Sequence, residues 1–318
     1  MLLAAVSRPG APGSAAGLTL PGVVSAPAAT TEREEQAAAR YWTPTRMADA
    51  TRTAAPATPA ATTATAAKAG AASGARPAWL SGNTASRGLR WTRHGVVART
   101  TGKVFFTLGG TDYMCSGSVV ESPRSDVVLT AAHCVSNGAG QWAANWTFIP
   151  GYQDGAEPYG RYTARRFFVS SRWRAGAEQY DVAFVQVNAA TLDGPRPHGT
   201  ALPRGAPVGF ATGQQASPAG AAYVFGYPAE PPYSGLFPDY CAGPVTADGH
   251  GSVRTPCAMT AGDSGGPWLA GFRPRQGAGT IVAVTTFKLT SDMHVLYGAV
   301  LGPAARVLYQ QASVSPSR

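Results

Sequence analysis

Between about residues 100 and 302, hydrophobic residues occur in short runs separated by glycine, proline, asparagine or aspartate. The clearest runs are rich in β-branched and aromatic residues and cover residues 104–108, 127–130, 181–187 and 280–284. Runs of this kind, bounded by turn residues, are typical of an all-β sandwich or barrel. The pattern therefore predicts an all-β domain.

One segment near the end of the chain has a helical pattern. Residues 303–311 begin with Pro303, which suits the first position of a helix, and carry apolar residues at Val307 and Leu308. We expect a short C-terminal helix.

The first 28 residues resemble a secretory signal peptide. They contain one arginine, Arg8, a weakly apolar stretch over residues 15–24, and small residues at Ala26 and Ala28. A disordered Ala/Pro tail would give a similar pattern, and this alternative stays open.

Residues 29–93 are rich in alanine, threonine, serine and proline, and the stretch 48–75 has no aromatic residue. Such a composition cannot bury enough surface to offset the entropy of ordering the chain. We expect a disordered propeptide or linker. Within it, residues 31–40 favour a short helix with acidic residues in its first turn, followed by the sequence Tyr41-Trp-Thr-Pro44.

The net charge of +9 does not indicate a nucleic-acid partner. Residues 1–93 hold ten basic and four acidic residues, so most of the excess lies outside the predicted β domain, where no basic cluster is interleaved with aromatics. No apolar run approaches the roughly 18 residues of a membrane span. A multi-pass membrane protein is excluded, and we expect no membrane or nucleic-acid partner.

Three residues of the predicted β domain carry the chemistry of a nucleophilic hydrolase. A serine hydroxyl needs a neighbouring base, histidine is the usual one, and a buried carboxylate can orient the imidazole. We expect Ser264 as nucleophile, His133 as general base and then acid, and Asp181 as the orienting carboxylate. Asp154 and Asp193 are rivals, but both lie in glycine-rich loop sequence and neither precedes an alternating apolar strand.

The sequences Leu129-Thr-Ala-Ala-His-Cys134 and Gly262-Asp-Ser-Gly-Gly-Pro267 resemble the histidine and serine motifs of trypsin-like serine peptidases. The resemblance covers about residues 94–311. It implies two six-stranded-type antiparallel β-barrels, at about residues 96–188 and 206–302, with the site between them. It also implies an oxyanion hole made of the backbone N–H groups of Gly262 and Ser264.

The same resemblance assigns Asp263 to a buried salt bridge that shapes the oxyanion hole. In zymogen-type members the partner is a freed N-terminal isoleucine or valine, and no such sequence precedes Thr100. We expect an internal arginine as the partner of Asp263.

Four cysteines admit three disulfide connectivities. The resemblance pairs Cys115 with Cys134, which leaves Cys241 with Cys257. An even cysteine count with loop-sized spacings indicates an oxidising compartment, so we expect a secreted protein.

The substrate pocket is predicted from the resemblance alone. Its base would be Ala258, where an aspartate would select arginine or lysine, and its wall would include Thr285, Thr286 and Phe287. Strict cleavage after arginine or lysine is therefore not expected. Either threonine offers a hydroxyl to a glutamate substrate, but Phe287 narrows the pocket, so we expect small or medium apolar side chains before the scissile bond.

The sequence thus predicts a secreted serine endopeptidase that acts on polypeptides through an acyl-enzyme intermediate. It is expected to be a monomer that needs no metal or organic cofactor, because the chain supplies nucleophile, base and oxyanion donors. Two alternatives remain: a catalytically silent binding module with this fold, or a latent protease that needs removal of its leader.

Overall fold

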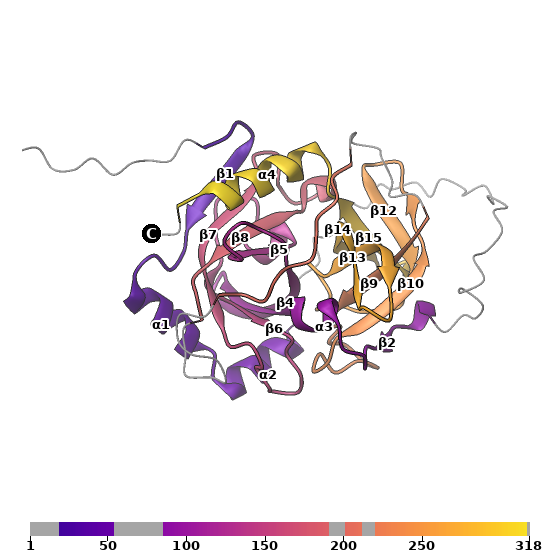
Figure 1. Cartoon of the computed structure of the whole chain (residues 1–318), viewed down its shortest axis with the longest axis horizontal. Coiled ribbons are helices and arrows are strands. Elements are labelled where there is room, and N and C mark those ends of the chain that lie inside the picture. Colours follow the sequence, from indigo (N-terminus) through magenta and orange to yellow (C-terminus); the bar gives the residue numbers. More distant parts are fainter. Residues whose placement is uncertain (1–18, 54–84, 191–200, 212–219, 317–318) are drawn as a thin grey trace, which may run out of the picture.

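The computed structural model of the chain describes residues 19–53, 85–190, 201–211 and 220–316. Two antiparallel sheets lie next to each other, the first mainly magenta and the second mainly orange in Figure 1. The predicted all-β architecture is confirmed.

The first sheet closes into a barrel. Its six barrel strands are β3 (Thr101–Leu108), β4 (Thr111–Val119), β5 (Val127–Thr130), β6 (Ala144–Pro150), β7 (Tyr162–Ser170) and β8 (Ala183–Val187). They follow the order β7-β6-β3-β4-β5-β8, and an additional pairing of β7 with β8 closes the ring. The interior is packed with apolar side chains such as Val104, Phe148 and Phe167, which are fully buried. Because apolar burial is the main favourable term in folding, this packed interior fixes the barrel.

The second sheet is curled but has an open seam. Its main strands are β9 (Ala221–Gly226), β10 (Asp239–Pro244), β12 (Ser252–Pro256), β13 (Pro267–Arg273), β14 (Ala278–Leu289) and β15 (Asp292–Val300). Two short strands, β2 (Leu89–Arg90) and β11 (Thr246–Ala247), lie at its two edges. No ladder joins β10 to β12 in the described residues, and the Cys241–Cys257 disulfide links the end of β12 to β10 across this seam.

The predicted C-terminal helix is present as α4 (Pro303–Val314). It lies against β7 and β8 of the first barrel and buries Leu308 and Ala312. A further short helix, α3 (Val96–Thr100), leads into β3. Within the described ranges, every helix is too short or too polar to cross a membrane.

The N-terminal region differs from the expectation of disorder. Residues 29–53 and 85–93, which lie in the segment predicted to be disordered, are described, and they carry α1 (Glu32–Tyr41), α2 (Pro44–Arg52), a 3-10 turn (Ala85–Arg87) and β2. The expected helix at residues 31–40 is α1, whose capping box joins Thr31 and Glu34. Residues 1–18 and 54–84 lie outside the described residues.

We call residues 19–53 the N-terminal clasp, because they run along the first barrel (Figure 1). Strand β1 (Val23–Pro27) lies within the segment expected to be a signal peptide, yet it pairs with β7 over five residues. Further along, Trp42 is only 1% exposed and donates its indole N–H to the carbonyl of Asn145 at 2.6 Å. These contacts with distant residues hold the clasp on the barrel, which its local composition does not predict.

Polar side chains of the barrel also hold the clasp. The Arg161 guanidinium donates to the carbonyls of Ala39 and Trp42 at 2.9 and 2.7 Å, and it pairs with Glu157. The side-chain amide of Asn188 donates to the carbonyl of Ala29 at 2.9 Å. Buried polar groups of this kind are stable only when paired, so the barrel surface and the clasp complement each other.

Lys103 of β3 lies buried beneath α2. Its Nζ donates to the Thr51 hydroxyl at 2.8 Å and lies 4.8 and 4.7 Å from the ring centres of Phe105 and Tyr152. Burial lowers the pKa of Lys103 to about 7, from 10.5. Between these two pH values the unfolded chain binds one proton more than the folded one, so stability rises with pH.

We expect Lys103→Met to be more stable than the wild type near pH 7 and to lose that advantage as the pH rises toward 10. The difference in unfolding free energy should shrink by up to about 1.4 kcal/mol per pH unit, because the variant lacks this titration. Urea denaturation at pH 7 and pH 9 measures it. Parallel pH profiles of the two proteins would contradict this account of Lys103.

Candidate active site

His133 and Asp181 are 48 residues apart but lie at the ends of two paired strands. His133 is in a 3-10 turn (Ala132–Cys134) that follows β5, and Asp181 precedes β8. Strands β5 and β8 pair in antiparallel register, with Thr130 opposite Ala183. The ladder therefore brings the two side chains to the same edge of the first barrel.

The Asp181 carboxylate makes two hydrogen bonds to His133. One oxygen accepts the backbone N–H of His133 at 2.8 Å, and the other lies 2.7 Å from the ring nitrogen Nδ1. Asp181 is 1% exposed and His133 is 7% exposed. This pair of bonds fixes both the position and the orientation of the imidazole.

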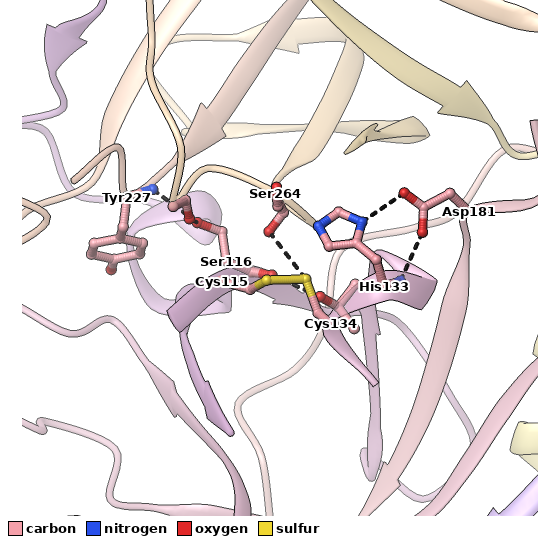
Figure 2. Close-up of a disulfide and its surroundings, with 9 residues drawn as sticks. Cys115, Ser116, His133, Cys134, Asp181, Tyr227 and Ser264 are labelled. Atoms are coloured by element: carbon pink, nitrogen blue, oxygen red, sulfur yellow. Dashed lines mark hydrogen bonds and ion pairs between the residues drawn. A yellow bond between two sulfur atoms is a disulfide. The ribbon is translucent and has the colours of Figure 1, made fainter. Parts of the chain in front are cut away.

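Ser264 reaches the same place from the second sheet, in the turn between β12 and β13. Figure 2 shows the imidazole between Asp181 and Ser264, with its second nitrogen toward the serine. That nitrogen, Nε2, is buried and has no hydrogen-bond partner among the described residues. The structure thus brings together the three residues that the sequence selected, and of the rival carboxylates Asp154 is exposed and Asp193 lies outside the described residues.

Strand β4 anchors the Ser264 turn. The backbone N–H of Ser116 donates to the carbonyl of Ser264 at 2.8 Å, and the Ser116 hydroxyl donates to the carbonyl of Gly262 at 2.8 Å. The Cys115–Cys134 disulfide joins β4 to the His133 turn, as Figure 2 shows. One strand therefore positions the elements that carry Ser264 and His133.

Two glycines after Ser264 are required by space. A Cβ atom at Gly265 would lie 2.2 Å from the Thr130 hydroxyl, and one at Gly266 would lie 2.0 Å from the carbonyl of Phe225. Gly265 also has a φ of +81°, which disfavours other residues. The close approach of Thr130 and Phe225 to the turn explains why the serine motif has glycine at positions 265 and 266.

The backbone N–H groups next to Ser264 differ in whether they donate a hydrogen bond within the described residues. Those of Gly265 and Gly266 donate to the carbonyls of Thr285 and Asp263. Those of Gly262 and Ser264 donate to no acceptor in the described part of the chain. Gly262 has a φ of +101°, a backbone conformation that glycine adopts readily. The two free donors are the ones expected to form an oxyanion hole.

The expected arginine partner of Asp263 is not present among the described residues. Asp263 is buried, its Oδ2 has no hydrogen-bond partner within the described ranges, and burial raises its pKa to about 7. The positive charge of Lys288 favours the ionised form of Asp263 and so limits this increase in its pKa. The Lys288 Nζ donates to the carbonyls of Cys257 and Met293. Lys288 lies in β14 with no motif around it, so the sequence offered no signal for it.

Of the expected pocket residues, Thr285 contacts the same turn: its carbonyl accepts from Gly265, and its N–H donates to the carbonyl of Gly266. Thr285 and Thr286 are buried, and their hydroxyls are already engaged: that of Thr285 accepts from the Trp268 indole, and that of Thr286 donates to the carbonyl of Tyr297. Phe287 stacks on Tyr297 with ring centres 4.6 Å apart. The Thr286 proton is therefore already engaged, whereas the Thr285 hydroxyl acts only as an acceptor in this bond.

Sequence reasoning missed the segment behind Ala258. The Ala258 backbone N–H donates to the carbonyl of Ser86 at 2.7 Å, and the Tyr233 hydroxyl donates to the carbonyl of Arg87. Both acceptors belong to the stretch predicted to be disordered. These bonds and the pairing of β2 with β10 order it, and all of them join residues far apart in the chain.

One group of potential metal ligands appears in the described residues: Cys115, His133 and Cys134. Both sulfur atoms form the disulfide, so they supply no thiolate. The His133 imidazole is therefore the one potential metal ligand left in this group.

Comparisons with known proteins agree with the fold and the motifs. Residues 115–271 match the trypsin-like peptidase domain family. The protease Anisep from Arthrobacter nicotinovorans is 33% identical, with a TM-score of 0.61 over 69% of this chain and 98% of its own. The thermostable serine protease AL20 from an extremophilic microorganism is 29% identical, with a TM-score of 0.60 over 69% of this chain and 99% of its own.

Among curated proteins, the glutamyl endopeptidase of Bacillus licheniformis is 32% identical over 75 residues. That match spans 23% of each chain, so this chain covers about a quarter of that relative. Fold and sequence match over nearly all of Anisep, and the histidine and serine motifs lie on the two adjoining sheets. The chain belongs to the family of trypsin-like serine peptidases.

Proposed function

We propose that this protein is a secreted serine endopeptidase in which Ser264, His133 and Asp181 form the catalytic triad. The observation that carries the proposal is the orientation of His133. Its Nδ1 is held by Asp181, while its Nε2 is directed toward Ser264 and has no partner in the part of the chain that the structure describes. This is the arrangement in which a histidine takes a proton from a serine hydroxyl.

The proposed reaction begins with attack of the Ser264 oxygen on the carbonyl carbon of the scissile peptide bond. His133 Nε2 takes the hydroxyl proton, and the negative charge that develops on the carbonyl oxygen is stabilised by the free N–H groups of Gly262 and Ser264. The C–N bond then breaks, and His133 gives its proton to the leaving amine. Water hydrolyses the acyl-enzyme by the same steps, with His133 again as base.

Localisation outside the cell is supported by the two disulfides, because such bonds persist in oxidising compartments. The predicted signal peptide lies partly outside the described residues, and its last part forms β1. We therefore propose that the protein acts outside the cell.

The substrate proposal is a small or medium apolar side chain before the scissile bond. Ala258 presents no carboxylate, and Phe287 packs against Tyr297 at the wall. A basic side chain would be buried there without a counter-charge, which costs several kcal/mol. Thr285 and Thr286 are both buried, and Thr286 donates its proton to the carbonyl of Tyr297, which argues against selection of glutamate.

A matched peptide series tests this preference. We expect kcat/KM for alanine or valine before the cleaved bond to exceed that for arginine by about 100-fold or more. The control variant Ala258→Asp should raise the rate for the arginine peptide alone. An enzyme that cleaves the arginine or glutamate peptide fastest would contradict the proposed pocket.

A further inference from the structure

The N-terminal clasp packs against residues that lie next to the proposed oxyanion hole. Trp42, Met47 and Ala50 are buried in one apolar cluster with Met114 and Tyr227. The other members of this cluster are Phe105, Ile149 and Tyr152. Helix α2 therefore supplies part of the packing around Met114 and Tyr227, both of which are fully buried.

Met114 and Tyr227 in turn enclose Gly262. A Cβ atom placed on Gly262 would lie 2.8 Å from the Met114 sulfur and 2.6 Å from the Tyr227 carbonyl. The Ser116 hydroxyl ties the same groups together, because it donates to the carbonyl of Gly262 and accepts the backbone N–H of Tyr227. Figure 2 shows Ser116 and Tyr227 beside the Ser264 turn. A continuous set of contacts thus leads from α2 to the Gly262 peptide.

The clasp does not occupy the catalytic centre itself. In the described residues, no hydrogen bond or ion pair joins residues 19–53 to His133, Asp181 or Ser264. Its polar contacts go instead to other residues, among them Asp112, Asn145 and Arg161. The clasp is placed to support the oxyanion turn, and its described contacts do not block the triad.

We propose that α2 holds the oxyanion turn in its active position through Met114 and Tyr227, with Met47 and Ala50 as positioning residues. This inference rests on the proposed function, since it requires Gly262 to donate to the reacting carbonyl oxygen. Protein interiors are close-packed, so a void beneath Met114 lets the turn shift. A shift of about 1 Å in a catalytic group lowers rates by up to about 10²-fold.

The test compares three variants on α2 in the full chain. We expect Met47→Ala to lower kcat by about 10- to 100-fold with KM unchanged, because an oxyanion donor acts in the transition state. Met47→Leu should restore kcat to within about twofold, since it refills the volume. Asp49→Ala, on the exposed side of the same helix, should match the wild type.

Lys103 reports whether the clasp has moved. The chain has three lysines, Lys68, Lys103 and Lys288, and the Nζ of Lys103 lies beneath α2. Amine acylation followed by mass spectrometry should therefore modify Lys103 faster in Met47→Ala than in the wild type. If Met47→Ala fails to fold, Ala50→Val takes its place, because an added volume at this buried site displaces α2 by overpacking.

Two outcomes overturn the inference, each in a folded Met47→Ala or Ala50→Val protein whose Lys103 has become reactive. One is a kcat within twofold of the wild-type value, and the other is a kcat above the wild-type value. The second would mean that the clasp restrains the enzyme. A wild-type protein that cleaves no peptide and resists a serine-directed probe would overturn the proposed function instead. The two failures are thus distinct.

Discussion

Replacing Ser264 by alanine is expected to abolish peptide hydrolysis, with kcat lowered by about 10⁶-fold. Losses of this size follow removal of the nucleophile in serine peptidases, because oxyanion stabilisation and substrate binding alone remain. The measurement is steady-state hydrolysis of an alanine-containing peptide by matched preparations of both proteins.

Thermal unfolding is the control that shows whether the Ser264→Ala protein is folded. The Ser264 backbone carbonyl, which accepts from Ser116, is unaffected by the change, so thermal unfolding should match the wild type closely. A folded variant with more than about a hundredth of the wild-type rate would show that another group is the nucleophile.

Asp181→Asn is expected to lower kcat by about 10⁴-fold near neutral pH. The asparagine amide still reaches the His133 ring, but its N–H₂ group can bind the wrong tautomer and supplies no negative charge for the imidazolium. The reason lies in the observed contact: one carboxylate oxygen lies 2.7 Å from Nδ1 and the other accepts the His133 backbone N–H. Rates measured on the same peptide test the prediction.

Asp154→Asn is the matched control for Asp181→Asn. Asp154 is the other candidate carboxylate that lies within the described residues. It is exposed, and its backbone N–H donates to the carbonyl of Leu236. This variant should keep the wild-type rate. Equal losses in the two variants would remove the special role of Asp181.

The sequence was informative where chemistry depends on short motifs. His133 and Ser264 were selected because their neighbours form recognisable motifs, and Asp181 because it begins an apolar strand. Strand pairing between β5 and β8 then explains why Asp181 meets His133. Likewise, Pro303 marked the start of α4, because proline at a first helical position is a local signal.

The sequence was uninformative where order depends on contacts between distant segments. Apart from the helix expected at residues 31–40, the clasp residues after 28 looked disordered from their alanine, threonine and proline content, yet Trp42 and Arg161 tie this segment to the first barrel. Lys288 was likewise missed as the basic group near Asp263, because its proximity arises from the fold of β14 and not from a motif. Composition describes local tendencies, and tertiary contacts can override them.

Labelling of the purified protein by a fluorophosphonate serine-hydrolase probe tests the central claim most directly, because the probe reacts only with an activated serine. We predict one label per molecule, located on Ser264 by mass spectrometry, and none on a folded Ser264→Ala protein. Failure of the folded wild-type protein to react, or equal labelling of the two proteins, would contradict the proposed catalytic triad.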